Sequence, residues 1–471
     1  MIKPPKFLQN IFSTQYMVRD DQRLGTITPS KEAYSESLKI AIPGMAEMVS
    51  IALMGMIDTV MVGRVGSSAV AAVGLTQQPR MIMLSVFMAM NIAMTAIVAR
   101  SKGAGDMNKA KSALRHAIMI GLGLGLLLTV LGVVFAEPLL YLAGAQYDTI
   151  GPSSMYFRIT SFALIFQVLT ATICAAQRAC GNTKITMRVN VTAKIISVCL
   201  NFLLIEGRFG FPRLEVEGAA ISTVIATGIA FCLALASVIR KDSVLRISWL
   251  DSWKFELPML KSMGRLASGG IAEQLALRVG FFLYARVVAG LGTDEFAAHI
   301  IVQQLMILSF TFADGIGAAT TALVGQNLGK KRPDLSIMYG KIGMRLAWCV
   351  SAMLALTVFL IRNRFPVLFT NEPHIIAAAS GVIMVLAIVM PIQTSQLVMG
   401  GSLRGAGDTR FVALTMLITV GIIRPVMGFL FTWTLGFGLI GAWIAIIFDQ
   451  GLRLILLFRR FSGGKWIKAK V

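Results

Sequence analysis

Two carboxylates lie in one apolar segment, residues 44–63, with the sequence GMAEMVSIALMGMIDTVMVG. A carboxylate at the centre of a bilayer costs roughly 2.5–3.5 kcal/mol on insertion scales, so it marks an ion pathway, a proton relay or a paired structural charge. Glu47 and Asp58 are about three helical turns apart and share one helix face. Burial favours the protonated form of a carboxylate. We therefore expect Asp58 to exchange protons, or to bind Na⁺ where oxygen ligands surround it.

The whole chain is apolar enough to reside in a membrane. Its 471 residues are 56% hydrophobic and 14% charged, whereas soluble domains have about 25% charged residues. The apolar stretches have the length of bilayer-spanning helices and lack the alternation of β-barrel strands. We predict an all-α polytopic membrane protein with twelve transmembrane helices, at residues 36–63, 70–99, 113–137, 150–176, 186–206, 217–239, 262–290, 296–326, 339–362, 375–401, 411–434 and 438–458.

The basic residues indicate how these helices are oriented. The formal charge of +21 would suggest a nucleic-acid partner in a soluble protein. Here Lys and Arg cluster in alternate loops, which is the positive-inside pattern and excludes that partner. We predict a multi-pass protein of the plasma (inner) membrane with both termini in the cytoplasm. The predicted parts are a cytoplasmic N-terminal segment (1–35), an N-lobe (36–240), a cytoplasmic linker (241–261), a C-lobe (262–458) and a cytoplasmic tail (459–471).

The two halves of the chain repeat with a constant spacing. Gly181 in RACGNTK corresponds to Gly407 in RGAGDTR, 226 residues later (407 − 181 = 226). The same spacing relates several polar pairs: Glu47 with Glu273, Gln167 with Gln393, and Arg178 with Arg404. Six helices per repeat give both repeats the same orientation, as in transporters that move two parallel lobes around a central cleft. The pattern therefore predicts two six-helix lobes and alternating access.

Four motifs together resemble the multidrug and toxic compound extrusion (MATE) family. They are IDTVMVGRVGSSAVAAVGL (57–75), RACGNTK (178–184), GIGAATTALVGQNLGKKR (315–332) and GGSLRGAGDTR (400–410). The segment LNFLLIEGRFGFP (200–212) is similar to the norfloxacin-efflux (NorM-like) branch. The resemblance implies the MATE/MOP fold, a monomer, and export of amphipathic, mostly cationic compounds in exchange for H⁺ or Na⁺, with no bound cofactor.

The resemblance also implies roles for individual residues. Asp58 matches the coupling acid of the first helix, and Asn201 and Thr223 complete an amino-lobe cation or proton site that is also a possible Na⁺ site. Ile205 stands where some members carry a second acid. Glu273 matches the acid of the seventh helix, and Gln393 replaces an acid of the tenth. Four residues form the predicted substrate or second coupling site: Glu273, Gln393, Glu47 and Gln167.

Each of these residues also has a structural interpretation. Asp58 could pair with Arg64, Glu273 with Arg278, and Glu47 could reach the cytoplasmic interface. Each glutamine could have a purely structural role, in which it forms hydrogen bonds between neighbouring helices. Asp314 and Asp449 could form structural salt links, for which the candidate partners are Arg80, Arg278, Arg286, Arg345 and Arg424. We prefer that interpretation for Asp449, and the role of Asp314 stays open.

Three other function classes were compared with drug export. A flippase for lipid-linked precursors, from the same superfamily, would need a cleft rich in Arg and Lys to hold a pyrophosphate. An intramembrane enzyme would need a motif such as HExxH, and an ATP-driven transporter would need a loop ending in GK[ST]. The sequence contains neither of those motifs. We therefore predict a transporter and not an enzyme.

Overall fold

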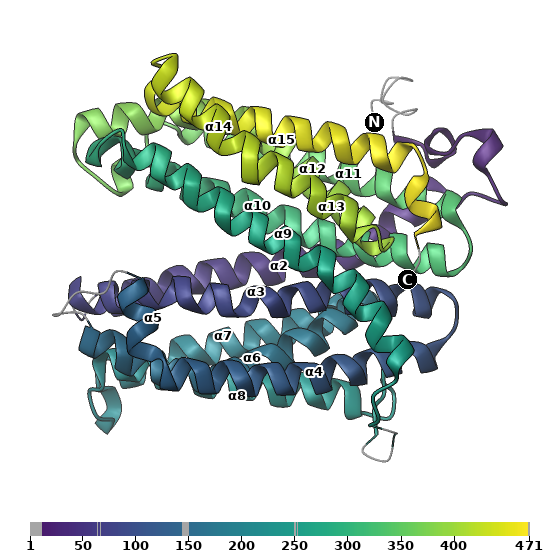
Figure 1. The fold of residues 1–471 in the computed structure, drawn as a ribbon, viewed down its shortest axis with the longest axis horizontal. Helices are drawn as coiled ribbons and strands as arrows, with labels where there is room; N and C mark the ends of the chain where they lie inside the picture. Colours follow the sequence, from purple (N-terminus) through teal and green to yellow (C-terminus); the bar gives the residue numbers. More distant parts are fainter. Residues whose placement is uncertain are drawn as a thin grey trace, which may run out of the picture. The chain divides into compact units, whose positions relative to one another are not determined.

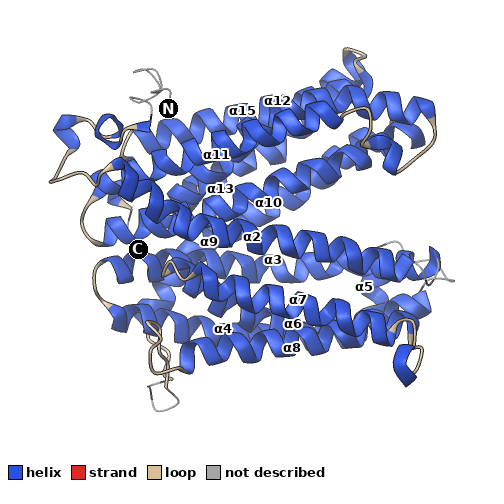
Figure 2. Cartoon of the chain, turned by 180° about the vertical axis from the view of Figure 1, so that it is seen from behind, coloured by secondary structure: helices blue, strands red, loops and turns tan. Residues whose placement is uncertain are grey.

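The computed structural model describes residues 12–63, 65, 67–143, 150–248, 251 and 253–469. Within these residues every regular element is helical (Figures 1 and 2). Twelve long helices follow one another along the described chain: α2 (Ser30–Gly63), α3 (Ser67–Gly103), α4 (Met107–Val134), α6 (Ile150–Ala179), α7 (Thr183–Leu204), α8 (Glu215–Ile239), α9 (Leu257–Ala289), α10 (Thr293–Gly329), α11 (Pro333–Ile361), α12 (Pro373–Gly405), the continuous run of α13 (Thr409–Met416), η5 (Leu417–Ile423), α14 (Arg424–Phe429) and η6 (Leu430–Thr434), and α15 (Gly438–Ser462).

Each of the twelve predicted spans corresponds to one of these helices, which confirms the polytopic all-α fold. Among the described residues, 11 helical stretches are long and apolar enough to cross a membrane. The helix outside that set is α9, whose middle carries Glu273, Gln274 and Arg278. The seventh span is therefore the most polar of the twelve. That composition is expected where a helix faces polar groups inside the protein.

Several helices begin before the apolar stretch that predicted them. The α4 helix begins at Met107 because the Asp106 side chain accepts a hydrogen bond from the Lys109 backbone N–H at 2.9 Å. The α11 helix begins with Pro333. Proline suits the first turn because backbone N–H groups there have no acceptor within the helix, so the N–H that proline lacks is not needed. The apolar pattern predicts only the lipid-embedded part, and the polar caps add the remaining turns.

The helices reproduce the repeat that the sequence predicts. The α3 and α10 helices both contain 37 residues and start at Ser67 and Thr293, which are 226 residues apart. The next helices pack in equivalent ways. In the amino unit α6 packs against α4 and α8, and in the carboxyl unit its repeat equivalent α12 packs against α11 and α15. A buried apolar cluster around Trp443 and Ile383 fills the space among α10, α11, α12 and α15. The same six-helix pattern is thus built twice.

The chain forms two compact units, each described here separately. The amino unit contains Ala46–Val98 and Asp106–Gly264, and the carboxyl unit contains Met1–Met45, Ala99–Gly105 and Arg265–Val471. The α2 helix is thereby divided at Met45. The predicted limits of the lobes and of their cytoplasmic segments stay predictions. Of those segments, residues 1–11, 249–250, 252 and 470–471 lie outside the described residues.

Two repeat-related glycines allow a close backbone crossing within the carboxyl unit. A Cβ on Gly103 would lie 2.7 Å from the Gln326 Cα, and a Cβ on Gly329 would lie 2.8 Å from the Ala104 backbone nitrogen. Real Cβ atoms do not approach other backbone atoms this closely. The ends of α3 and α10 can therefore cross only because both positions lack a side chain.

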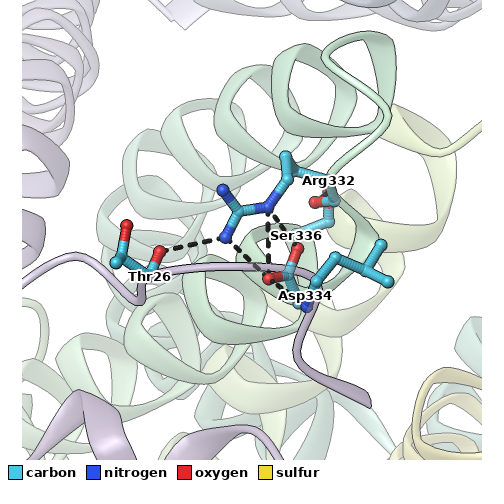
Figure 3. A network of polar contacts seen from close by, with 5 residues as sticks. Thr26, Arg332, Asp334 and Ser336 are labelled. Atoms are coloured by element: carbon cyan, nitrogen blue, oxygen red, sulfur yellow. Dashed lines mark hydrogen bonds and ion pairs between the residues drawn. The ribbon is translucent and has the colours of Figure 1, made fainter.

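The segment before α2 is held against the start of α11 (Figure 3). The Arg332 guanidinium donates to Asp334 at 2.7 Å and to the Thr26 carbonyl at 3.0 Å, and the Leu24 N–H donates to Asp334 at 3.2 Å. The hydrogen bond with the Asp334 carboxylate raises the pKa of Arg332 above its usual value. Met17 and Val18 are buried beside this network. The segment is thus part of the carboxyl unit's packing.

Candidate functional site

Asp58, near the end of α2, contacts two side chains of α7. Its Oδ1 accepts a hydrogen bond from the Asn201 Nδ2 at 2.8 Å, and its Oδ2 accepts one from the Lys194 Nζ at 3.2 Å. Asn201 in turn accepts through its Oδ1 from the Ser222 hydroxyl on α8. The structure thus brings Asp58 and Asn201 together and links three helices through them. Arg64, the alternative partner of Asp58, lies outside the described residues.

Thr223 lies next to this network, but its hydroxyl does not point at Asp58. The Thr223 Oγ1 donates to the Ala219 carbonyl of its own helix at 2.9 Å. Ser222, one residue earlier, is the hydroxyl that contacts Asn201. Tyr156 of α6 lies near Thr223. Ser222, and not Thr223, therefore joins the Asp58–Asn201 hydrogen bonds, and the role of Thr223 in a cation site stays a prediction.

Lys194 is a member of this site that the sequence analysis missed. It lies seven residues before Asn201, two helical turns, and therefore on the same face of α7. A single lysine in the middle of an apolar span was a usable signal, because such a charge needs a partner inside the protein. Its side chain is 35% exposed, and the Asp58 side chain is 23% exposed. Neither side chain is fully buried, and Lys194 also lines the cavity described below.

Glu47 is buried under three donors of the amino unit. It accepts from Arg178 at 3.1 Å, from the Thr186 hydroxyl at 2.6 Å and from the Asn190 amide at 2.6 Å. Only 1% of its side chain is exposed, so it does not reach the interface. The two carboxylates of α2 therefore have different surroundings: Glu47 is enclosed, while Asp58 is partly open.

Glu273 forms the equivalent ion pair in the carboxyl unit. It accepts from Arg404 at 2.6 Å, which is the repeat partner of the Glu47–Arg178 contact. The positions equivalent to Thr186 and Asn190 are Val412 and Met416, neither of which can donate. The Glu273 Oε2 consequently has no hydrogen-bond partner among the described residues. The ion pair with Arg404 replaces the alternative pairing with Arg278.

The two predicted glutamines, Gln167 and Gln393, occupy equivalent positions of the two repeats but have different partners. The Gln167 Oε1 accepts from the Arg80 guanidinium at 2.7 Å. The Gln393 Nε2 donates to the backbone carbonyl of Met306, the repeat equivalent of Arg80, at 3.4 Å. Its Oε1 has no partner among the described residues. The amino unit therefore keeps donors that the carboxyl unit has lost.

The amino unit encloses a cavity of about 360 Å³ among the middles of its helices. Three of the predicted residues, Glu47, Gln167 and Thr223, line this cavity together with polar groups that were not predicted to line a site. The polar lining consists mainly of Glu47, Arg80, Gln167, Arg178, Asn190 and Lys194, and Met48, Ile51 and Ala226 add apolar surface. A concave pocket with apolar walls and a few convergent polar groups is typical of a small-molecule site.

Asp449 of α15 is held between two arginines of the carboxyl unit. Its Oδ1 accepts from Arg453 at 2.5 Å and its Oδ2 accepts from the Arg424 Nε at 2.7 Å. All three side chains are buried, which agrees with the structural link preferred from the sequence. Pro425 removes one helical hydrogen bond beside Arg424, where the helix widens into the π-helical turns of η5. Asp314 lies near Arg404.

These observations define a class of protein. Long, mostly apolar helices that form the same pattern twice, with a polar cavity among the helices of the amino unit, are typical of a polytopic membrane transporter. The sequence model of the MatE family matches residues 43–203 and again residues 271–430. The chain belongs to the MATE family, in its NorM-like branch, and members of this family are transporters and not enzymes.

Relatives and solved structures agree over nearly the whole chain. The uncharacterized transporter YisQ of Bacillus subtilis is 29% identical over 85% of this chain and 88% of its own. The probable multidrug resistance protein NorM of Thermotoga maritima is 27% identical over 93% and 94%. A structure titled as an outward-facing multidrug resistance MATE transporter of the MOP superfamily superposes with a TM-score of 0.86 and 18% identity over 98% and 99%, which supports the fold.

Proposed function

We propose that this chain exports amphipathic, mostly cationic small molecules across the plasma membrane, each in exchange for a proton that binds at Asp58. The printed names of relatives support efflux of drugs, since NorM of Thermotoga maritima and PmpM of Pseudomonas aeruginosa are both described as multidrug resistance proteins. The cavity of the amino unit has the size and mixed lining that such molecules require.

The contacts of Asp58 carry the proposal. A carboxylate in a membrane is costly unless it is paired, and here Lys194 supplies the pairing charge from another helix. When Asp58 takes up a proton, it loses the charge that holds the Lys194 ammonium. The link between α2 and α7 then weakens, and the balance between two conformations of the amino unit shifts. Proton binding and cavity shape are coupled in this way, which is what alternating access requires.

The groups around Asp58 favour H⁺ over Na⁺ as the coupling ion. Na⁺ is held by oxygen ligands, but the two side chains that contact Asp58 do so through nitrogen atoms that carry hydrogens. The Thr223 hydroxyl is engaged with its own helix, and the Asn201 oxygen faces Ser222. A sodium ion would have to displace the Lys194 ammonium and turn the Asn201 amide. A proton needs neither change.

Orientation and assembly complete the proposal. The alternation of basic loops supports cytoplasmic termini, and both predicted ion sites are built from one chain, which supports a monomer. We do not favour a flippase for lipid-linked precursors. In the cavity, Arg178 and Lys194 are already bonded to carboxylates, which leaves Arg80 alone among the described basic residues of the lining, and one guanidinium does not balance the several negative charges of a pyrophosphate.

The test is transport by purified protein in liposomes, with one gradient imposed at a time. Ethidium is the cationic probe, and liposomes without protein measure leakage. We expect a pH gradient alone to drive accumulation, and a Na⁺ gradient at equal pH to have no effect. Accumulation that depends on the Na⁺ gradient would overturn the choice of ion, and no accumulation with either gradient would overturn secondary active export.

A further inference from the structure

Arg80 is a charged residue of the cavity that has no role in the proposed exchange of protons. It lies in the middle of α3 and lines the cavity, and its guanidinium donates to the neutral Gln167 Oε1 at 2.7 Å. Among the described residues, no carboxylate lies within ion-pair distance of it. A guanidinium that faces a neutral amide at membrane depth is expensive to maintain, because it gains no opposite charge there.

The other charged groups of the cavity are already neutralised. Arg178 is bonded to Glu47 at 3.1 Å, and Lys194 is bonded to Asp58 at 3.2 Å. After these two pairs are counted, the positive charge of Arg80 remains. The cavity wall therefore presents one fixed positive charge to whatever enters it.

The position is specific to the amino unit. Its repeat equivalent in the carboxyl unit is Met306, where the backbone carbonyl alone meets Gln393. The fold therefore accepts an uncharged side chain at this position, so the positive charge is not a requirement of helix packing.

We propose that Arg80 binds the carboxylate of zwitterionic amphiphilic substrates, with Gln167 holding the guanidinium in place. Arginine suits this role because its planar fork of N–H donors matches a carboxylate. The inference rests on the proposed drug site in this cavity, and what it adds is Arg80 as the residue that recognises the carboxylate of a compound with both an amine and a carboxylate. Such a compound keeps the cationic group that the family resemblance implies.

The probes are a zwitterionic quinolone and its ethyl ester, which differ in the carboxylate. Equilibrium binding to the purified protein is compared for wild type, Arg80→Met, Arg80→Lys and the control Arg158→Met. The control removes a half-exposed arginine that pairs with Glu137 outside the cavity. Binding does not depend on an ion gradient, so it tests Arg80 even where gradient-driven export fails.

We expect wild type to bind the acid about tenfold or more tightly than the ester, because a charge-assisted hydrogen-bonded pair is lost in the ester. Arg80→Met should remove that preference and leave ester binding within about twofold, Arg80→Lys should keep part of it, and Arg158→Met should change nothing. Equal binding of acid and ester by wild type would overturn the proposal, and this result does not depend on any variant folding. An equal loss for both compounds in Arg80→Met, with unchanged ester binding in Arg80→Lys, would also overturn it.

Discussion

The two repeat-related ion pairs allow a matched test of what surrounds each buried carboxylate. Arg178 and Arg404 are 21% and 19% exposed, and their partners Glu47 and Glu273 are 1% and 4% exposed. Replacing either arginine by methionine therefore removes the same group from nearly the same burial. The two glutamates differ in the donors that remain.

The expected magnitudes follow from those donors. After Arg178→Met, Glu47 keeps the Thr186 hydroxyl and the Asn190 amide, each at 2.6 Å. We expect a loss of about 1.5–3 kcal/mol, the value of one hydrogen bond to a charged group. After Arg404→Met, Glu273 keeps no hydrogen-bond donor among the described residues, and Arg453 acts on it only through space. Breaking such a pair costs about 3–5 kcal/mol because a buried charge is left alone.

The assay is thermal unfolding of the purified variants in detergent, followed by tryptophan fluorescence. Arg404→Met should lower the unfolding temperature more than Arg178→Met does. Adding Glu273→Gln to Arg404→Met should recover most of the loss, since it removes the unpaired charge, whereas Glu47→Gln should recover little in Arg178→Met. An equal or larger loss in Arg178→Met, or no recovery in the Glu273→Gln double variant, would refute this account of the two sites.

The remaining predictions concern packing, the N-terminal segment and topology. Gly103→Ala and Gly329→Ala should each cost about 1–3 kcal/mol through overpacking and reduce the yield of folded protein, whereas Gly123→Ala, where a Cβ meets nothing within 4 Å, should give a normal yield by gel filtration. Asp334→Asn should weaken the hold on Arg332 and Leu24 and speed tryptic cleavage at Arg19 and Arg23, with unchanged cleavage arguing against the network of Figure 3. In a cysteine-free background, an impermeant maleimide should label Asn371→Cys but not Asp242→Cys on intact cells, and the reverse result would invert the predicted orientation.

The fold was predictable because it depends on features that the sequence states directly. Apolar length predicts each span, and the spacing of 226 residues between Gly181 and Gly407 predicts the repeat. The Asp58–Asn201 contact followed from the family resemblance. What the sequence could not supply was the partner of each charge. Thr186 and Asn190 are ordinary polar residues, and only the packing of α7 on α2 turns them toward Glu47.

The basic residues inside the membrane were the main source of error. Arg80 was considered as a partner for Asp314 or Asp449, but its contact is Gln167. Arg424 does meet Asp449, together with Arg453, which the sequence analysis did not single out. Lys194 was missed because one charge in an apolar span gives no indication of its partner. Contacts of this kind depend on how each helix is rotated about its own axis. A helix that is apolar on all sides shows no apolar face that would indicate this rotation.

The central claim is that Asp58 couples proton uptake to export, and one measurement tests it directly. Asp58→Asn keeps the size of the side chain and removes its charge, and Asp58→Asn with Lys194→Gln also removes the ammonium that would be left unpaired. Both variants are reconstituted into liposomes beside wild type, and ethidium accumulation is measured under an imposed pH gradient, with ethidium binding to each protein as the control for folding. We predict that both variants bind ethidium and that neither accumulates it in response to the gradient. Gradient-driven accumulation by either variant at the rate of wild type would contradict the role of Asp58.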